Sequence, residues 1–309
     1  MPVLVTGASG YVGSALVPRL QAEGHDIRAF ARDPARVAAA GVRGVPIVVG
    51  DAVTGTGLDE ALAGVDVAYY LIHSMEPPGG DGDFAVRERL AAERFATAAE
   101  AAGVRRIVYL GGLVPATRTA SAHLASRLAV EEVLSAAAPE ALMLRASIVV
   151  GARSRSFRFL VRLVERVPVM PLPAWRDYRT QPIDGRDVLA FLVAGARSPV
   201  VHGRLSLDIA GPDVVTYGEL VQRIGDALLV GRMPLRLGFN LTPVASRVAA
   251  AIAGEEHALI GPLMEGLSGD LLPRDDRAAE LLGVRLHRLD AAIERALRDW
   301  EAVEELRAR

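Results

Sequence analysis

The stretch that decides the fold is Pro2-Val3-Leu4-Val5-Thr6, followed by Gly7-Ala8-Ser9-Gly10-Tyr11-Val12-Gly13. The first five residues form a short apolar run typical of a buried strand. The next seven place glycine at every third position, and apolar side chains then recur at helical spacing at Val12, Leu16, Val17 and Leu20. Strand, glycine turn and helix in this order predict the opening unit of a doubly wound parallel α/β sheet.

Each glycine of the turn has a separate physical use. Gly7 permits a sharp turn, Gly10 lets backbone N–H groups approach a diphosphate, and Gly13 lets the helix pack closely on the strand. The N-terminus of the helix then presents unpaired N–H groups and a positive dipole end to the phosphates. The alternative is a glycine-rich turn that binds nothing. We predict a dinucleotide site whose contacts here are Thr6, Gly7, Ser9, Gly10, Tyr11, Val12 and Gly13.

Composition limits the classes of function. The chain has 309 residues, of which 51% are hydrophobic, and this is enough for a sizeable core. A net charge of −2 gives no reason to expect a nucleic acid or anionic membrane partner, and the absence of cysteine excludes disulfides and thiol catalysis. The first strand begins at residue 2, and the longest apolar stretches, near 187–196 and 248–260, are short or broken by charge. We therefore expect a soluble cytoplasmic protein with a small-molecule substrate; the sequence does not decide its oligomeric state.

The end of the second expected strand, Asp26–Ala31, selects the dinucleotide. An arginine there pairs with the 2′-phosphate of NADP, whereas a carboxylate binds the ribose hydroxyls of NAD. Arg32 comes first and Arg36 follows one helical turn later. Asp33 precedes a proline that opens the next helix, although its carboxylate could instead turn inward. We predict NADP, with NAD as the alternative and a solvated surface charge as the simplest explanation of Arg32.

Further strands are expected at 45–49, 65–72, 106–110 and 141–146, with helices at 84–102 and 121–137 between them. The carboxyl ends of these strands meet at one edge, where a dinucleotide would lie. Asp51 follows the third strand and could reach the adenine or cap the next helix. Residues 76–83, rich in proline and glycine, form either a lid or a plain connection. The remaining cofactor contacts expected along this edge are Asp51, Ala52, Leu71, Ile72, His73 and Gly111.

Several motifs resemble the extended and atypical short-chain dehydrogenases/reductases. Residues 6–13 are similar to their Thr-Gly-x-x-Gly-x-x-Gly, and residues 101–109 look like the segment entering their fifth strand. Residues 144–151 resemble their Leu-Arg-Pro-x-x-Val-Tyr-Gly, and residues 181–188 resemble the strand and helix start that follow their substrate lobe. More narrowly, 69–75 and 123–127 are similar to NAD(P)-binding proteins described as sugar-nucleotide epimerase-like or NmrA-like. The resemblance implies a Rossmann fold and an oxidoreductase.

The same resemblance locates a catalytic set that departs from the family pattern. Family enzymes use Tyr-x-x-x-Lys plus a hydroxyl residue after the fifth strand. The matching stretch here is His123-Leu124-Ala125-Ser126-Arg127, and the hydroxyl position falls at Gly111-Gly112-Leu113. One hypothesis is that His123 is the general acid and Arg127 holds the ribose or diphosphate. The other is a dinucleotide-binding sensor or partner-binding module without turnover.

Other polar residues are weighed against structural roles. Ser126 or Ser74 could hydrogen-bond the substrate oxygen. His73, at the end of a strand, is a second candidate for a polar contact in the site. Alternatively, His123 caps its helix, Arg127 pairs with an acid such as Glu131, and His73 bonds to backbone. No His-x-x-x-His pair or ligand-spaced carboxylate cluster occurs, so no metal is expected.

After Gly151 the pattern changes to that of a smaller lobe. We expect residues 1–151, with 181–210 returning to them, to form the Rossmann domain, and 152–180 with 211–309 to form the lobe. Phe157, Met170 and Trp175 are candidates to line an apolar substrate pocket, or they simply pack the lobe. Thr216 and Glu219 have the spacing of a capping box, and 289–309 reads as a charged amphipathic helix. Residues 230–253 could serve a pocket, a dimer face or a peripheral membrane contact. We predict an oxidoreductase acting on a small, fairly apolar carbonyl or alcohol, with a redox sensor or an epimerase-like enzyme as alternatives.

Overall fold

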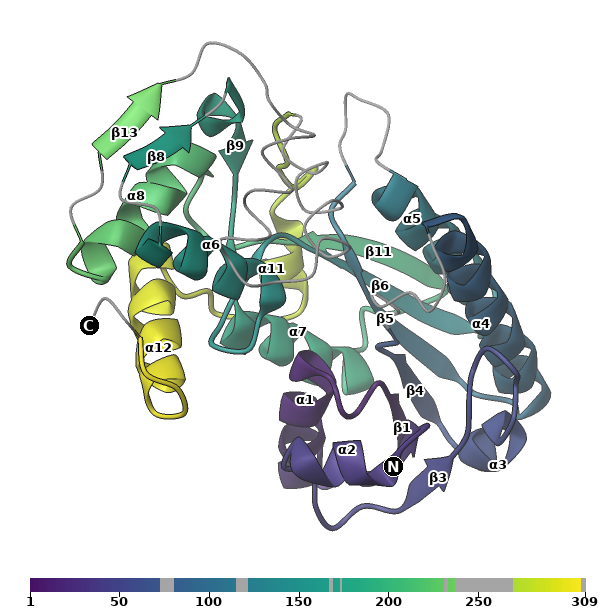
Figure 1. Ribbon diagram of the computed structural model, residues 1–309. Helices are drawn as coiled ribbons and strands as arrows, with labels where there is room; N and C mark the ends of the chain where they lie inside the picture. The colour runs from purple at the N-terminus through teal and green to yellow at the C-terminus, as the bar shows by residue number, and fades with distance from the viewer. Residues whose placement is uncertain are drawn as a thin grey trace.

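The computed structural model describes residues 1–72, 81–114, 122–166, 169–172, 174–230, 233–236 and 269–306. Its centre is a parallel sheet of seven strands in the order β11-β6-β5-β4-β1-β2-β3 (Figure 1). The strands are β1 Pro2–Thr6, β2 Asp26–Ala31, β3 Ile47–Val49, β4 Val67–Tyr70, β5 Arg106–Gly112, β6 Glu140–Ala146 and β11 Arg204–Ile209. The predicted doubly wound Rossmann sheet is confirmed.

Helices cover both faces of the sheet because successive strand residues point to opposite sides. On β1, Val3 and Val5 pack with one set of helices, whereas Leu4 packs with the other. The first set is α1 Tyr11–Ala22, α2 Pro34–Ala39, α7 Gly185–Arg197 and α11 Arg277–Leu281. The second set is α3 Leu58–Leu62, α4 Asp81–Ala101 and α5 Ala122–Ser135. The result is a three-layer sandwich (Figure 1).

Several predicted helix ends are confirmed by their capping groups. Asp33 is the N-cap of α2 and accepts a hydrogen bond from the Ala35 N–H, with Pro34 in the first turn. Gly103 follows α4 with φ of 69°, in the left-handed region that glycine favours. Thr216 and Glu219 form the reciprocal capping box that opens α8 Tyr217–Ala227.

A second group of elements lies to the left of the sheet in Figure 1, where the sequence predicts a smaller lobe. Helices α6 Arg155–Arg166, α8 and α12 Leu289–Glu301 enclose a separate apolar core together with the 3-10 turn η1 Ala174–Asp177. Three short strand pairs accompany them: β7 Val149–Val150 with β10 Ile183–Asp184, β9 Arg179–Thr180 with β12 Val215–Thr216, and β8 Val169–Leu172 with β13 Met233–Arg236. Residues 237–253, to which a pocket, dimer or membrane role was assigned, lie outside the described residues.

Some boundaries differ from the prediction. The third strand begins at Ile47 instead of residue 45, the fourth spans only Val67–Tyr70, and the last helix ends at Glu301. The apolar residues of a predicted strand continue beyond the hydrogen bonds that it makes with a neighbouring strand, and the observed strand ends where those bonds end. No helix within the described ranges is long and apolar enough to cross a membrane.

Candidate functional site

The glycine turn is held by the strand beside it. Gly7 has φ of 66°, and a Cβ there would lie 2.5 Å from the carbonyl oxygen of Leu71 at the end of β4. A Cβ on Gly13 would overlap the Gly7 carbonyl. Both positions therefore require glycine, for the turn and for the close approach of α1. Since β1 and β4 flank the point where strand order reverses, the turn opens into the crevice where such sheets bind ligands.

Gly10 differs from its two neighbours because space above it is open. It is the N-cap of α1 in an extended conformation, and a Cβ there would meet only the Gly7 carbonyl oxygen, at 3.2 Å. No side chain caps the first turn of α1. An open, glycine-lined helix N-terminus fits a diphosphate, because the backbone N–H groups and the helix dipole both favour an anion.

Thr6 links the turn to the sheet. Its hydroxyl donates to the Tyr69 carbonyl and accepts from the Leu71 N–H, each at 3.0 Å, and the side chain is fully buried. These bonds fix β1 against β4 directly below the turn. Ser9 and Val12 are half-buried at its rim.

The end of β2 carries the two arginines predicted to select the cofactor. Arg32 and Arg36 are both exposed, and no ion pair among the described residues involves either of them. Asp33 instead uses one carboxylate oxygen to cap α2, 2.8 Å from the Ala35 nitrogen. The capping bond holds Asp33 against its own helix, which leaves the arginines as the cations available at this strand end.

Asp51 occupies a local turn after β3. Its carboxylate accepts the Val53 N–H at 2.8 Å, and its backbone pairs with that of Thr56. The N-cap of α3 is Gly57, so the suggestion that Asp51 caps the following helix is wrong. The tight Asp51–Thr56 turn intervenes before the helix begins. Ala52 is buried beneath it.

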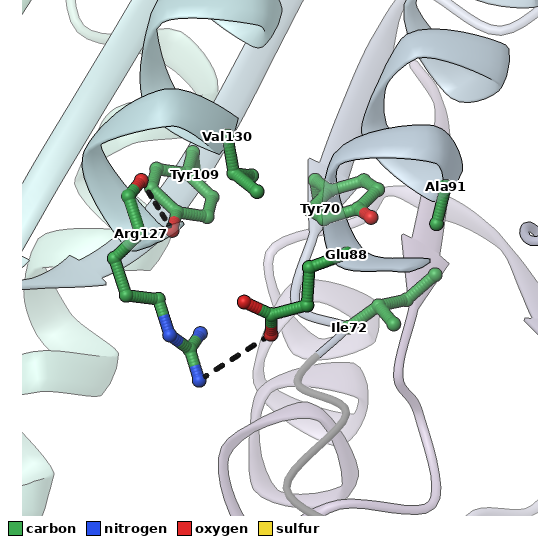
Figure 2. Close-up of a pocket in the computed structure, with 7 residues that line it drawn as sticks. All are labelled: Tyr70, Ile72, Glu88, Ala91, Tyr109, Arg127 and Val130. Atoms are coloured by element: carbon green, nitrogen blue, oxygen red, sulfur yellow. Dashed lines mark hydrogen bonds and ion pairs between the residues drawn. The ribbon is translucent and has the colours of Figure 1, made fainter. Parts of the chain in front are cut away.

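A buried ion pair lies between α4 and α5 (Figure 2). The guanidinium of Arg127 is 3.7 Å from the carboxylate of Glu88, and both side chains are more than nine-tenths buried. Ser126 donates its hydroxyl to the same carboxylate at 2.9 Å. Figure 2 shows the two charged groups directed toward each other, with Ile72, which follows β4, beside Glu88. Arg127 therefore lies at the expected edge of the sheet with part of its charge compensated.

Two tyrosines form the wall behind this pair. Tyr109 donates its hydroxyl to the Arg127 carbonyl at 3.4 Å, and burial raises its pKa to about 12. Burial also raises the pKa of Tyr70, and the negative charge of Glu88 adds to that effect. Both phenols are therefore protonated near neutral pH, and they act as neutral walls.

Arg127 pairs with an acid, as the structural alternative predicts, but that acid is Glu88 and not Glu131. Glu131 instead forms two hydrogen bonds with Arg145 of β6, at 2.9 and 2.7 Å, and accepts a third from Ser206. Arg145 also approaches Asp208 of β11 at 3.7 Å. This network ties α5 to the sheet through a bidentate arginine–carboxylate contact.

The other predicted catalytic residues are only partly described. His73 and Ser74 lie outside the described residues. His123 lies in the first turn of α5, one turn before Arg127, and its side chain is outside the described part. Leu71 is buried, whereas Ile72 and Gly111 are half-buried at the ends of β4 and β5. No group of three or more potential metal ligands occurs among the described residues.

The residues predicted to line a substrate pocket have different surroundings. Phe157 is completely buried in the core of the lobe, so it has no surface to offer a ligand. Trp175 lies in the same core, edge-on to Tyr217 with ring centroids 6.2 Å apart, and its indole N–H has no partner there. The Met170 side chain lies outside the described part.

Sequence reasoning missed Glu88. The detectable sign was a carboxylate on the apolar stripe of a helix, since Glu88 is three and four residues before the buried Ala91 and Ala92. A buried carboxylate needs a cationic or hydrogen-bonding partner, but the pattern does not say which one.

The described geometry defines a class of protein: a Rossmann sheet with an open glycine turn at its switch point is a dinucleotide-binding domain. A sequence model of NAD(P)H-binding proteins matches residues 7–148. Ceramide reductase of Caulobacter vibrioides is 31% identical over 233 residues, which cover 75% of this chain and 71% of that protein. The chain belongs to the extended and atypical short-chain dehydrogenase/reductase family of NAD(P)-binding oxidoreductases.

Other relatives and solved structures agree on the fold. A probable dTDP-4,6-dihydroxy-2-methyloxan-3-one 4-ketoreductase of Streptomyces antibioticus is 28% identical over 82% of this chain and 87% of its own length. UDP-glucuronic acid 4-epimerase from Bacillus cereus, solved with UDP-glucuronic acid and NAD, superposes with a TM-score of 0.73. The two are 14% identical, and the match covers 98% of this chain and 100% of the epimerase. At that identity the likeness shows the fold alone.

Proposed function

We propose that this protein is an NADP(H)-dependent oxidoreductase that interconverts a small, fairly apolar carbonyl compound and its alcohol. The observation that carries the cofactor half of the proposal is the open N-terminus of α1 at Gly10. Beside it, the end of β2 carries a carboxylate engaged in capping and two arginines that form no ion pair within the described part of the chain. Those arginines favour the 2′-phosphate of NADP over the bare ribose of NAD.

The chain's own residues would hold the cofactor along the carboxyl edge of the sheet. The glycine turn would bind the diphosphate, Arg32 with Arg36 would bind the 2′-phosphate, and the ends of β4 and β5 would support the nicotinamide half. A bound NADPH supplies the hydride. The protein must then deliver a proton to the substrate oxygen so that the alcohol forms.

His123 is the residue proposed to deliver that proton. It occupies the position of the family tyrosine, in the first turn of α5, and imidazole titrates near neutral pH. Arg127 one turn later would hold the ribose side of the cofactor as a fixed cation, with its orientation set by Glu88. Ser74 and His73 are proposed as further contacts to the substrate oxygen.

The substrate class rests on two supports. A relative that is 31% identical over 75% of this chain is called a ceramide reductase, and a second relative is called a 4-ketoreductase. Both names describe carbonyl reduction, and the first describes a largely apolar substrate. An epimerase acting on sugar nucleotides is less supported, because the neighbours solved with such ligands share the fold at only 14–21% identity.

A dinucleotide sensor without turnover is the second candidate. It is favoured by the Glu88 carboxylate, which compensates the charge that the family lysine leaves free for catalysis.

Turnover separates the two candidates. NADPH consumption should be followed with a panel of aldehydes and ketones of increasing chain length, on the native protein, His123→Ala and His202→Ala. His202 is an exposed histidine after α7 and serves as the matched control. We expect the native protein and His202→Ala to turn over a carbonyl substrate. His123→Ala should lose turnover but still bind NADPH. Turnover that survives in His123→Ala contradicts the assigned acid, and unequal binding of NADPH and NADP⁺ with no turnover of any carbonyl favours the sensor.

A further inference from the structure

A separate cavity lies on the side of the sheet covered by α1 and α7, where these helices face α12. Its volume is ≈ 480 Å³, within the usual range for small-molecule sites. It is bounded by one face of α1, by the start of α7, by the segment after β7 and by α12. Of the residues predicted to bind the dinucleotide, only Tyr11 lines this cavity. It is therefore a different site from the cofactor crevice.

The apolar part of the cavity comes from both lobes. It is lined by Ala15, Val150, Leu189, Ala292, Ala296 and Trp300. The Trp300 ring is itself held in place, since the Arg158 guanidinium stacks 4.1 Å from the ring centroid. An apolar wall of this kind takes a hydrocarbon or aromatic body.

The polar part carries an excess of positive charge. Five arginines and two aspartates line the cavity, and three of the arginines are already paired: Arg158 with Glu304, Arg186 with Asp184, and Arg295 with Asp299. The other two, Arg19 and Arg153, have no carboxylate partner among the described residues. Arg19 donates only to the Arg186 carbonyl and Arg153 only to the Ser14 hydroxyl, so each keeps unused N–H donors.

The pKa of Tyr11 depends on the charged groups that line the cavity. Burial raises its pKa to about 12, the charge of Asp184 adds to the rise, and the charges of Arg153 and Arg19 act against it. Both arginines are therefore near enough to the Tyr11 hydroxyl to lower its pKa. A guanidinium with free donors at the rim of an apolar cavity matches a planar carboxylate.

We propose that this cavity binds an amphipathic monoanion, with its carboxylate on Arg19 and Arg153 and its apolar body against Ala15, Leu189 and Val303, above the buried Trp300. The inference does not depend on the proposed oxidoreductase activity, because none of the proposed catalytic residues lines the cavity.

Octanoate is a suitable probe for this cavity, with acetate as the anion lacking an apolar body and 1-octanol as the body lacking a charge. Titration calorimetry should use the full chain saturated with NADPH, so that the cofactor crevice is occupied. We expect octanoate to bind, and the double variant Arg19→Gln, Arg153→Gln to weaken binding by about tenfold or more. Arg43→Gln, an exposed arginine between α2 and β3, is the matched control and should leave affinity unchanged.

Fluorescence locates the probe independently. The chain has two tryptophans, so Trp175→Phe leaves Trp300 as the only indole. Octanoate should change the emission of this variant, whereas acetate and 1-octanol should not do so at equal concentration. The proposal is overturned if octanoate does not bind, if it binds the double variant as well as the native protein, or if the Trp300 emission is unaffected.

Discussion

The carboxylate of Glu88 on α4 lies 3.7 Å from the guanidinium of Arg127 on α5, and the same carboxylate accepts the Ser126 hydroxyl. Two neighbouring residues of α5 thus depend on one acid from another helix. This relationship fixes the helix that carries His123 and Arg127 at the edge of the sheet where the cofactor is expected (Figure 2).

Removal of that acid should be costly. Glu88→Ala leaves Arg127 buried without its carboxylate, so we expect the free energy of unfolding to fall by about 3 kcal/mol or more. Denaturant unfolding followed by circular dichroism measures the loss. The control is Glu93→Ala on the same helix, whose pair with Arg89 is largely exposed and should contribute almost nothing. If the two variants lose equal stability, the pair is not structural.

The glycine turn can be tested without destroying the fold. Gly10 has an extended backbone with φ of −76°, so Gly10→Ala is tolerated, but its methyl group would project into the space proposed for the diphosphate. We expect dinucleotide affinity to fall by about tenfold or more, with stability changed by less than about 1 kcal/mol. Calorimetric titration and thermal unfolding measure the two effects. The control is Gly225→Ala in α8, where a Cβ has room at 3.5 Å, and it should bind dinucleotide normally. Unaltered binding by Gly10→Ala would place the diphosphate elsewhere.

Acid sensitivity should come in part from the opposite edge of the sheet. Two hydrogen bonds from Arg105 hold the pKa of Asp66 below its ordinary value of 3.8. Between the lowered pKa and pH 3.8, the folded state therefore binds fewer protons than the unfolded state. This stabilisation is present above pH 3.8 and is lost as pH falls through the lowered pKa.

Asp66→Asn removes this contribution. Because both side chains are partly exposed and screened, we expect a loss of about 1 kcal/mol or less near neutral pH, and a smaller further loss on acidification. Unfolding free energies measured from about pH 7 to about pH 3 would show a flatter profile for the variant. Parallel profiles for the variant and the native protein would show that Asp66 has no such role.

The sequence predicted those parts of the fold that depend on neighbouring residues. The β1 strand, glycine turn and α1 helix, the Asp33-Pro34 helix start and the Thr216 capping box each rest on residues within a few positions of one another. Strands that alternate with helices also predict a parallel sheet covered on both faces, because few topologies satisfy that alternation. The division of the chain into two domains remains a prediction.

The contacts of the site could not be predicted in the same way. Glu131 is one helical turn from Arg127, and this spacing suggests that the two residues pair. Instead, Glu131 accepts two hydrogen bonds from Arg145 of β6. The partner of Arg127 is Glu88, which is far away in the sequence. Likewise, Phe157 lies on an apolar helix face that could have bordered a ligand, and only the packing of α8 and α12 shows that it is core. Choices of this kind depend on how distant segments pack.

The most direct test of the account is a titration of the native chain and Arg32→Ala with NADPH and with NADH, with Arg43→Ala as an exposed arginine control. We predict that the native chain and the control prefer NADPH, and that Arg32→Ala loses about 1–3 kcal/mol of that preference. An unchanged preference in Arg32→Ala would contradict the assignment of the 2′-phosphate site. Failure of both dinucleotides to bind the native chain would contradict the oxidoreductase and the sensor together.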